Sequence, residues 1–256
     1  MQLTITTLQG IPEIQPGNNL VDIFCLALRK NQLLLADGDI VVIAQKIVSK
    51  AEGRFVNLES VVPGKDAIKL AKEIEKDVRL VELILSESNE VLRTRPGTII
   101  VEHKSGFVCA NAGIDHSNVF REGGDPDLWY LLLPEDSDRS ANLFRDGVKD
   151  QLNVDIGVMI IDSHGRAWRN GTVGTVIGLC GVPGVVDMRG KLDMYGYKLQ
   201  NTIIAAADEL AGSASLMMGQ ANEKSPMVVV KGFPYSLRTN ASVKEVIRPR
   251  DQDLFR

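Results

Sequence analysis

Glycines recur at short intervals between residues 170 and 190, at positions 171, 174, 178, 181, 184 and 190. Valine, isoleucine and leucine stand between them, which favours backbone packed closely against other elements over a flexible linker. Residues 199–218 follow with many alanines, glycines and serines, a composition typical of a helix that another element approaches closely. The two segments predict a tightly packed layer in the C-terminal half of the chain.

Hydrophobic periodicity predicts strands and helices in irregular alternation along the whole chain. Strands are expected at residues 3–8, 40–44, 98–102, 106–110, 154–161 and 227–230, the third and fourth forming a hairpin. Helices are expected at residues 19–35, 66–86 (as one helix or two), 137–153 (capped by Ser137 or Asp138) and 199–218, and a loop at 45–54. We therefore expect a single module over residues 1–256, of α+β or mixed α/β class, and not a doubly wound sheet.

Composition excludes several classes of protein. The formal net charge is −4 over 256 residues, without a dense Lys/Arg run, so nothing points to a nucleic-acid partner. The three cysteines, Cys25, Cys109 and Cys180, form no CxxC pair, so each is expected to be a buried apolar residue and not a disulfide or zinc ligand. There is no signal-peptide pattern, and the apolar runs are too short to span a bilayer. We expect a soluble, cytoplasmic protein with no membrane partner.

The strong motifs of nucleotide, metal and hydrolase chemistry are missing. The sequence contains no GxxxxGK[ST] phosphate loop, no GxGxxG fingerprint, no HExxH and no GxSxG elbow. The three histidines, His103, His116 and His164, show no metal-ligand spacing. Any nucleotide site must therefore be of an unusual kind.

Two aspartates follow apolar strands in short polar segments. Asp115 lies in the segment Asn111–Asn118, and Asp162 follows the expected strand 154–161 directly, at the mouth of that strand. Carboxylates in such places are ligands for Mg²⁺ or Mn²⁺, and the Ser163 hydroxyl would add a further oxygen. The alternative is that each is an ordinary turn in which polar side chains cap the backbone. Local sequence alone leaves both interpretations open.

Two further polar segments allow a phosphate or metal site. Residues 45–54 bring two lysines and an arginine after a buried strand, and lysine is a suitable point charge for phosphate. Residues 218–226 join the small-residue helix to the last strand, and their amide and carboxylate groups suit a metal or phosphate site. Taken singly, the first segment favours a solvated basic loop and the second a connection.

Six segments in order along the chain carry a resemblance that no one of them would carry alone: Gly10–Ile14, Val48–Arg54, Asn111–Asn118, Asp162–Arg166, Asp193–Gly196 and Met218–Gln220. Together they resemble the coenzyme F-420 gamma-glutamyl ligase family, from about residue 10 to residue 232. The resemblance implies an enzyme that uses GTP to join L-glutamate to the deazaflavin precursor of coenzyme F-420. The first bond is an amide, later glutamates are gamma-linked, and an acyl phosphate is the expected intermediate.

The resemblance also implies a fold and cofactors. We expect an α+β fold of two interlocked lobes in an intertwined homodimer, without a P-loop or Rossmann fold. A divalent cation, Mg²⁺ or Mn²⁺, and often K⁺, would accompany the GTP. Some relatives carry a C-terminal flavin-dependent reductase-like domain. Because this chain ends at Arg256, we expect the stand-alone form without flavin.

Individual positions take their expected roles from the same resemblance. Asp115 and Asp162 match carboxylate metal ligands. Together with Lys50 they are the expected catalytic residues. Lys50, Arg166 or Arg169 would offset negative charge. Ser163 and Gln220 complete the expected metal set. The expected nucleotide contacts are Ile11, Pro12, Glu13, Ile14, Gln45, Lys46, Lys50, Asn118, Met218, Gly219, Gln220, Ala221, Asn222, Glu223, Lys224 and Ser225. The pair Gln45-Lys46 departs from the small hydroxyl pair of archaeal members.

Two other functions remain compatible with the residues. One is a GTP- or ATP-dependent amide ligase with a different acceptor, because acceptor specificity lies in the shape of a pocket. The other is a non-catalytic nucleotide-binding or interaction protein. The presence of both Asp115 and Asp162 weighs against it, since a simple binder has less need of paired metal ligands.

Overall fold

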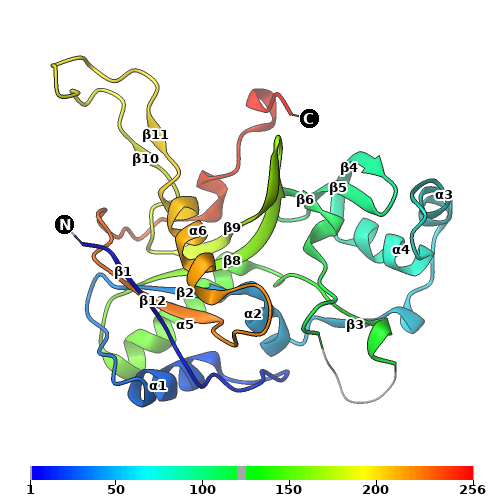
Figure 1. Cartoon of the computed structure of the whole chain (residues 1–256), viewed down its shortest axis with the longest axis horizontal. Coiled ribbons are helices and arrows are strands. Elements are labelled where there is room, and N and C mark those ends of the chain that lie inside the picture. The colour runs from blue at the N-terminus through cyan, green and yellow to red at the C-terminus, as the bar shows by residue number, and fades with distance from the viewer. Residues whose placement is uncertain (1, 120–124, 256) are drawn as a thin grey trace.

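A five-stranded sheet in the order β1-β12-β2-β8-β9 forms the centre of the computed structural model, which describes residues 2–119 and 125–255 (Figure 1). Strands β2 and β8 are parallel, and the other neighbouring pairs are antiparallel. The strands of this sheet are β1 (Thr4–Thr7), β2 (Ile40–Ala44), β8 (Gly157–Arg166), β9 (Arg169–Cys180) and β12 (Met227–Lys231).

Both faces of the central sheet are buried along β2, β12 and the first half of β8, where alternate residues of a strand serve opposite faces. Val158 and Ile160 of β8 join the cluster that includes residues of α1, α2 and α5. Met159 and Ile161 of β8 join the cluster under α6. The helices of these layers are α1 (Leu20–Lys30), α2 (Gln45–Ala51), α5 (Ser137–Leu152) and α6 (Ala206–Met218).

The glycines of β9 let two helices approach its backbone, as the sequence predicted. A Cβ added to Gly174 would lie 2.5 Å from the carbonyl oxygen of Ala211 in α6. One added to Gly178 would lie 2.3 Å from the Cβ of Ser137, at the start of α5. Such contacts are possible only without side chains at these two positions.

A second core lies to one side of the central sheet, around α3 and α4 (Figure 1). These helices pack on an antiparallel sheet in the order β4-β5-β6. Phe107, between β5 and β6, packs against both this core and the one that includes α1 and α5. The elements of this region are α3 (Lys65–Ile74), α4 (Val78–Ser86), β4 (Ser88–Arg95), β5 (Thr98–His103) and β6 (Val108–Ala110), with the nearby pair β3 (Phe55–Asn57) and β7 (Trp129–Leu131).

An arm of residues 188–202 extends away from the body between β10 (Val186–Asp187) and β11 (Ile203–Ile204) (Figure 1). Short 3-10 helices complete the structure at Leu58–Ser60, Asn111–Gly113, Pro126–Leu128, Val243–Glu245 and Arg250–Gln252. In the described part of the chain no helix is long and apolar enough to cross a membrane. The fold is mixed α+β with several sheets, as predicted, and the three cysteines are free and buried, also as predicted.

Several predicted boundaries were wrong. The expected loop at 45–54 is largely the helix α2, which follows β2 without an intervening turn and buries Ile47 and Val48. The first long helix ends at Lys30, because Gln32 has a positive φ of 52° that stops it. The last long helix begins at Ala206, after the two-residue strand β11. The side chain that caps α5 is Asp136, one residue before the two candidates.

Strand β8 also differs from its prediction, with consequences for Asp162. It starts at Gly157 and continues through Asp162 to Arg166, in an antiparallel ladder with β9. Asp162 is thus inside a strand, opposite Thr175, and not at a strand mouth. The ladder with β9 is a tertiary feature, and it overrides the turn-like composition of residues 162–166.

Candidate active site

Gln45 and Asp162 come next to each other where β2 ends. In the parallel β2–β8 pair, Ala44 lies opposite Ile161, so the chain positions that follow are neighbours. Asp162 is largely buried, and the Nε2 atom of His164 lies 3.0 Å from its Oδ2. The two side chains share one face of β8 because they are two residues apart.

Asp115 is held by its backbone and is not part of a free turn. Its N–H donates to the carbonyl of Leu131, and the Leu131 N–H donates back, both at 2.9 Å. The preceding residues Asn111 and Ala112 have φ values of 51° and 54°, which turn the chain out of β6. Asn111 also accepts a hydrogen bond from the Ile99 N–H through its side chain, at 3.2 Å.

The first turn of α2 supplies two polar partners to Asp115. The Nε2 group of Gln45 donates to Oδ2 of Asp115 at 2.5 Å, and the Nζ of Lys46 lies 3.2 Å from the same oxygen. Gln45 is itself buried, and the Ser49 hydroxyl donates to its Oε1 at 2.9 Å. That bond leaves the amide nitrogen of Gln45 directed at the carboxylate.

The two aspartates are close enough to influence each other. Burial is the main cause that raises the pKa of Asp115; Lys46 opposes this shift and Asp162 adds to it. Two carboxylates in a partly buried site with one ammonium group nearby favour a further cation. Among the described residues no group of three or more His, Cys, Asp or Glu side chains forms a metal site. The available donors are hard oxygens, which suit Mg²⁺ or Mn²⁺.

Ser163 and Gln220 form a separate pair on the opposite face of β8. The Ser163 hydroxyl donates to Oε1 of Gln220 at 2.7 Å, and Nε2 of Gln220 donates to the Ser215 hydroxyl of α6 at 2.8 Å. Because Ser163 follows Asp162 in a strand, their side chains point to different faces. The four expected metal ligands are thus two pairs in this structure, Asp115 with Asp162 and Ser163 with Gln220.

The expected nucleotide residues form a ring of connected loops. Lys46 donates to the Ser117 carbonyl at 2.8 Å, and Asn118 donates to the Ala221 carbonyl at 3.0 Å. These bonds join the segments after β2, after β6 and after α6. The remaining expected contacts of the last segment are Met218 at the end of α6, Gly219 as its cap, the exposed Asn222, Glu223 and Lys224, and the buried Ser225.

Residues 11–14 contact the core that includes α1, and they also contact the helix α2. Ile14 is buried in the core with α1, Ile11 packs against that core, and Pro12 lies exposed between them. The Glu13 carboxylate accepts a hydrogen bond from the largely buried Lys50 ammonium. This ion pair fixes the loop to α2.

The remaining expected cations do not reach the two aspartates. Within the described residues Lys50 makes its ion pair with Glu13 and none with Asp115 or Asp162. Arg166 and Arg169 are exposed near the end of the β8–β9 hairpin, where Arg166 donates to the Gly171 carbonyl at 3.1 Å. Lys46 is the cation beside Asp115.

From the sequence, no role was predicted for His164 beside Asp162, for Phe107 next to His164, or for His103 stacked on Phe107. The Phe107 ring lies 5.4 Å from His164 and 5.1 Å from His103, as ring-centroid distances. Burial lowers the pKa of His103 to about 4, and its Nε2 has no hydrogen-bond partner among the described residues. Alternation along β8 would have placed His164 beside Asp162 had the strand been predicted to continue. No local signal points to Phe107 or His103, which come from another sheet.

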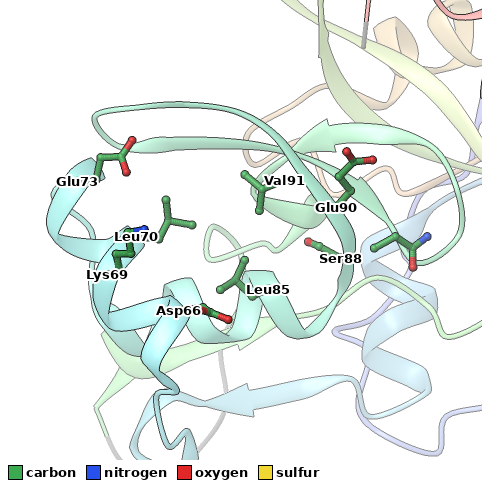
Figure 2. Close-up of a pocket in the computed structure, with 9 residues that line it drawn as sticks. Asp66, Lys69, Leu70, Glu73, Leu85, Ser88, Glu90 and Val91 are labelled. Carbon is green, nitrogen blue, oxygen red and sulfur yellow. The ribbon is translucent and has the colours of Figure 1, made fainter.

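A surface groove lies away from these residues. It has a volume of 470 Å³ and runs between α3, α4 and β4, with Asp66, Leu70 and Val91 among its lining residues (Figure 2). None of the expected site residues lines it. We therefore take the ring of loops around Asp115 and Asp162, and not this groove, as the candidate active site.

Comparison with known proteins agrees with the ordered motifs. The family described as F420-0:Gamma-glutamyl ligase matches residues 10–232. The coenzyme F420:L-glutamate ligase of Methanothermobacter thermautotrophicus is 41% identical over 100% of both chains. That of Methanopyrus kandleri is 40% identical over 95% of this chain and 94% of its own. That of Archaeoglobus fulgidus is 37% identical over 100% of this chain and 97% of its own.

Proposed function

The chain belongs to the F420-0:Gamma-glutamyl ligase family and is a ligase, and from that premise we propose that it joins L-glutamate to the coenzyme F-420 precursor at the expense of GTP. The first product is an amide, and further glutamates are added through gamma linkages. One observation carries the proposal. Asp115 and Asp162 are far apart in the sequence, yet they lie close enough for the charge of Asp162 to raise the pKa of Asp115.

The chemistry requires activation of a carboxylate, because oxide is a very poor leaving group. A carboxylate oxygen of the precursor attacks the γ-phosphorus of GTP, which gives an acyl phosphate and GDP. The amine of glutamate then attacks the acyl carbon, the C–N bond forms, and inorganic phosphate leaves. An enzyme contributes to such steps mainly by positioning the reactants and neutralising charge.

Asp115 and Asp162 would hold the divalent cation, Mg²⁺ or Mn²⁺, and the cation would neutralise phosphate charge. Gln45 and Lys46 fix the orientation of the Asp115 carboxylate through contacts at 2.5 and 3.2 Å. Ser163 and Gln220 offer a second set of oxygens on the other face of β8. A requirement for K⁺ is part of the proposal and is tested by adding and removing it in the assay.

The GTP contacts are proposed along the ring of loops. The Glu13–Lys50 ion pair supports residues 11–14, and the Asn118–Ala221 hydrogen bond supports residues 218–225. Gln45 and Lys46 contact Asp115, so their influence on the nucleotide would pass at least in part through that carboxylate. We also propose a cytoplasmic homodimer.

Mass spectrometry of the product tests the activity. The protein is incubated with the precursor, GTP, Mn²⁺ and L-glutamate, and we expect mass increments of one glutamyl residue each. ATP in place of GTP is the nucleotide control, and omission of the precursor is the acceptor control. Glutamate transfer only to another acceptor, or equal turnover with ATP, would contradict the corresponding part of the proposal.

Asp115→Asn and Asp162→Asn test the carboxylate pair. Each change removes a negative ligand but keeps the size of the side chain, so we expect loss of turnover with a folded protein. Turnover by phosphate release and thermal unfolding are the two measurements. Near-normal ligation by either variant at ordinary metal concentration would exclude the role given to that residue.

A further inference from the structure

His164 contacts Asp162 in the candidate metal site, but it has none of the roles proposed above. Its Nε2 lies 3.0 Å from Oδ2 of Asp162, and both side chains are largely buried. The two residues stand on the same face of β8, so the bond needs no movement of the backbone. One oxygen of Asp162 therefore has a fixed donor, and the orientation of the carboxylate plane follows from it.

The imidazole of His164 is in turn held from the second core. The ring of Phe107 lies 5.4 Å from it and is tilted by 40°. Phe107 stacks on the buried His103 at 5.1 Å with the two planes 9° apart, so its own rotation is restricted. It also packs against both hydrophobic cores. The turn between β5 and β6 thus reaches Asp162 through one ring contact, Phe107 with His164, and the hydrogen bond from His164 to Asp162.

We propose that His164 is a positioning residue: its Nε2–H holds the Asp162 carboxylate in the orientation that binds the divalent cation, and Phe107 holds His164. This inference rests on the proposed role of Asp162 as a metal ligand. Hydrogen-bond partners of metal ligands commonly change metal affinity or activity by about 10–100-fold when they are removed. The second core therefore contributes to metal binding without supplying a metal ligand.

Direct Mn²⁺ binding to the full chain tests the proposal without turnover. Free Mn²⁺ is titrated by electron paramagnetic resonance in the presence of GDP. His164→Phe keeps a ring against Phe107 but removes the donor, and we expect about 10–100-fold weaker Mn²⁺ binding. His164→Gln restores an N–H donor and should bind Mn²⁺ more tightly than His164→Phe. Equal affinity of wild type and His164→Phe would overturn the proposal.

Phe107→Leu tests the support of the imidazole, with Phe144→Leu as its matched control. Both changes trim a packed ring, but Phe144 meets Phe24 edge-to-face in the core with α1, and among the described residues it makes no ring contact with His164. We expect weaker Mn²⁺ binding for Phe107→Leu only, although both variants lose thermal stability. A parallel loss of Mn²⁺ affinity in both would show a merely structural effect and would contradict the role of Phe107.

Two further measurements separate this inference from the proposed function. If Asp162→Asn leaves Mn²⁺ binding unchanged, the metal role of Asp162 fails and the inference fails with it. If Asp162→Asn abolishes binding while His164→Phe does not alter it, only the inference fails. A directly bound imidazole nitrogen in the pulsed resonance spectrum of the Mn²⁺ complex would make His164 a ligand and would also overturn the positioning role. In steady-state kinetics, His164→Phe should need a higher Mn²⁺ concentration for half-maximal activity, while its KM for glutamate stays unchanged.

Discussion

His103 is 3% exposed, and this burial favours the neutral form of its imidazole. Burial lowers its pKa from 6.5 to about 4, against the opposing attraction of Glu87. Between these two values the unfolded chain binds a proton that the folded chain does not, so the free energy of unfolding falls as pH falls from 6.5 towards 4. Over this range the titration of His103 lowers the free energy of unfolding by roughly 3 kcal/mol in total, and above pH 6.5 it does not lower it.

Urea unfolding of the wild type and His103→Phe at pH 7.5, 6.0 and 5.0 measures this effect. The phenylalanine keeps the stacking on Phe107 but does not titrate, so its stability should fall less steeply with pH. Other groups titrate equally in both proteins, and their contributions cancel in the difference. Parallel stability curves for the two proteins would show that His103 does not contribute.

The residues around the candidate site were predictable to different degrees. Asp115 and Asp162 were named from their sequence context and the ordered motifs, because short polar segments after apolar strands are visible locally. The bond from Gln45 to Asp115 was not predictable, since it joins residues 70 apart through the start of an unexpected helix. The separation of Ser163 from Asp162 depends on the β8–β9 ladder, which extends a strand through residues of weak strand propensity.

At the scale of elements, the glycines of β9 control how closely the helices pack. In Gly178→Ala the new methyl group would lie 2.3–2.6 Å from the Cβ and backbone of Ser137, and the helix backbone cannot yield as a flexible side chain would. We expect a loss of about 1–3 kcal/mol in the free energy of unfolding, which is typical of overpacking. Chemical denaturation measures it.

Gly165→Ala is the matched control in the same hairpin. Apart from its two chain neighbours, no described residue has an atom within 4 Å of the position that its Cβ would take. The free energy of unfolding should therefore change little. A similar destabilisation in both variants would mean that the hairpin tolerates no side chain at either glycine, and that close helix packing is not the cause.

Elements with a strong local pattern were predicted well, and those fixed by distant partners were not. Strand β2 is entirely apolar and β12 is apolar up to its last residue, Lys231, and both were predicted within a residue of their bounds. Strand β4 was missed, because it is polar and half-exposed and exists through its pairing with β5. Helix α2 was missed because it is seven residues long and carries lysines at a site where a loop was expected.

At the scale of the whole molecule, the class of fold followed from the irregular order of elements, but the arrangement of two cores did not. Nothing in the local sequence marks Phe107 as the residue that packs against both cores. Such a contact joins segments from different sheets, and periodicity within one element carries no information on it. The arm of residues 188–202 was also not predicted, although its motif Asp193–Gly196 was part of the family resemblance.

The arm of residues 188–202 carries large apolar side chains that are exposed to solvent in the single chain. Met194 and Tyr195 are each 87% exposed, and Leu192 and Tyr197 beside them are also exposed. Asp193 fixes the tip, because its carboxylate accepts from the N–H groups of Tyr195 and Tyr197, both at 2.8 Å. An ordered tip that presents a group of large apolar side chains is typical of a protein interface. We expect this arm to bind a second copy of the chain in the proposed homodimer.

Analytical ultracentrifugation of wild type and of the double variant Met194→Asp with Tyr195→Asp tests the arm. Wild type should sediment as twice the 28.0 kDa chain, and the variant should associate at least about tenfold more weakly, as expected for loss of large apolar contacts at an interface centre. Val62→Asp is the control, because Val62 is 86% exposed but stands in a separate loop before α3. The same weakening in that control would assign the effect to added charge. A monomeric wild type would contradict the homodimer itself, whereas a dimeric double variant would place the interface on another surface.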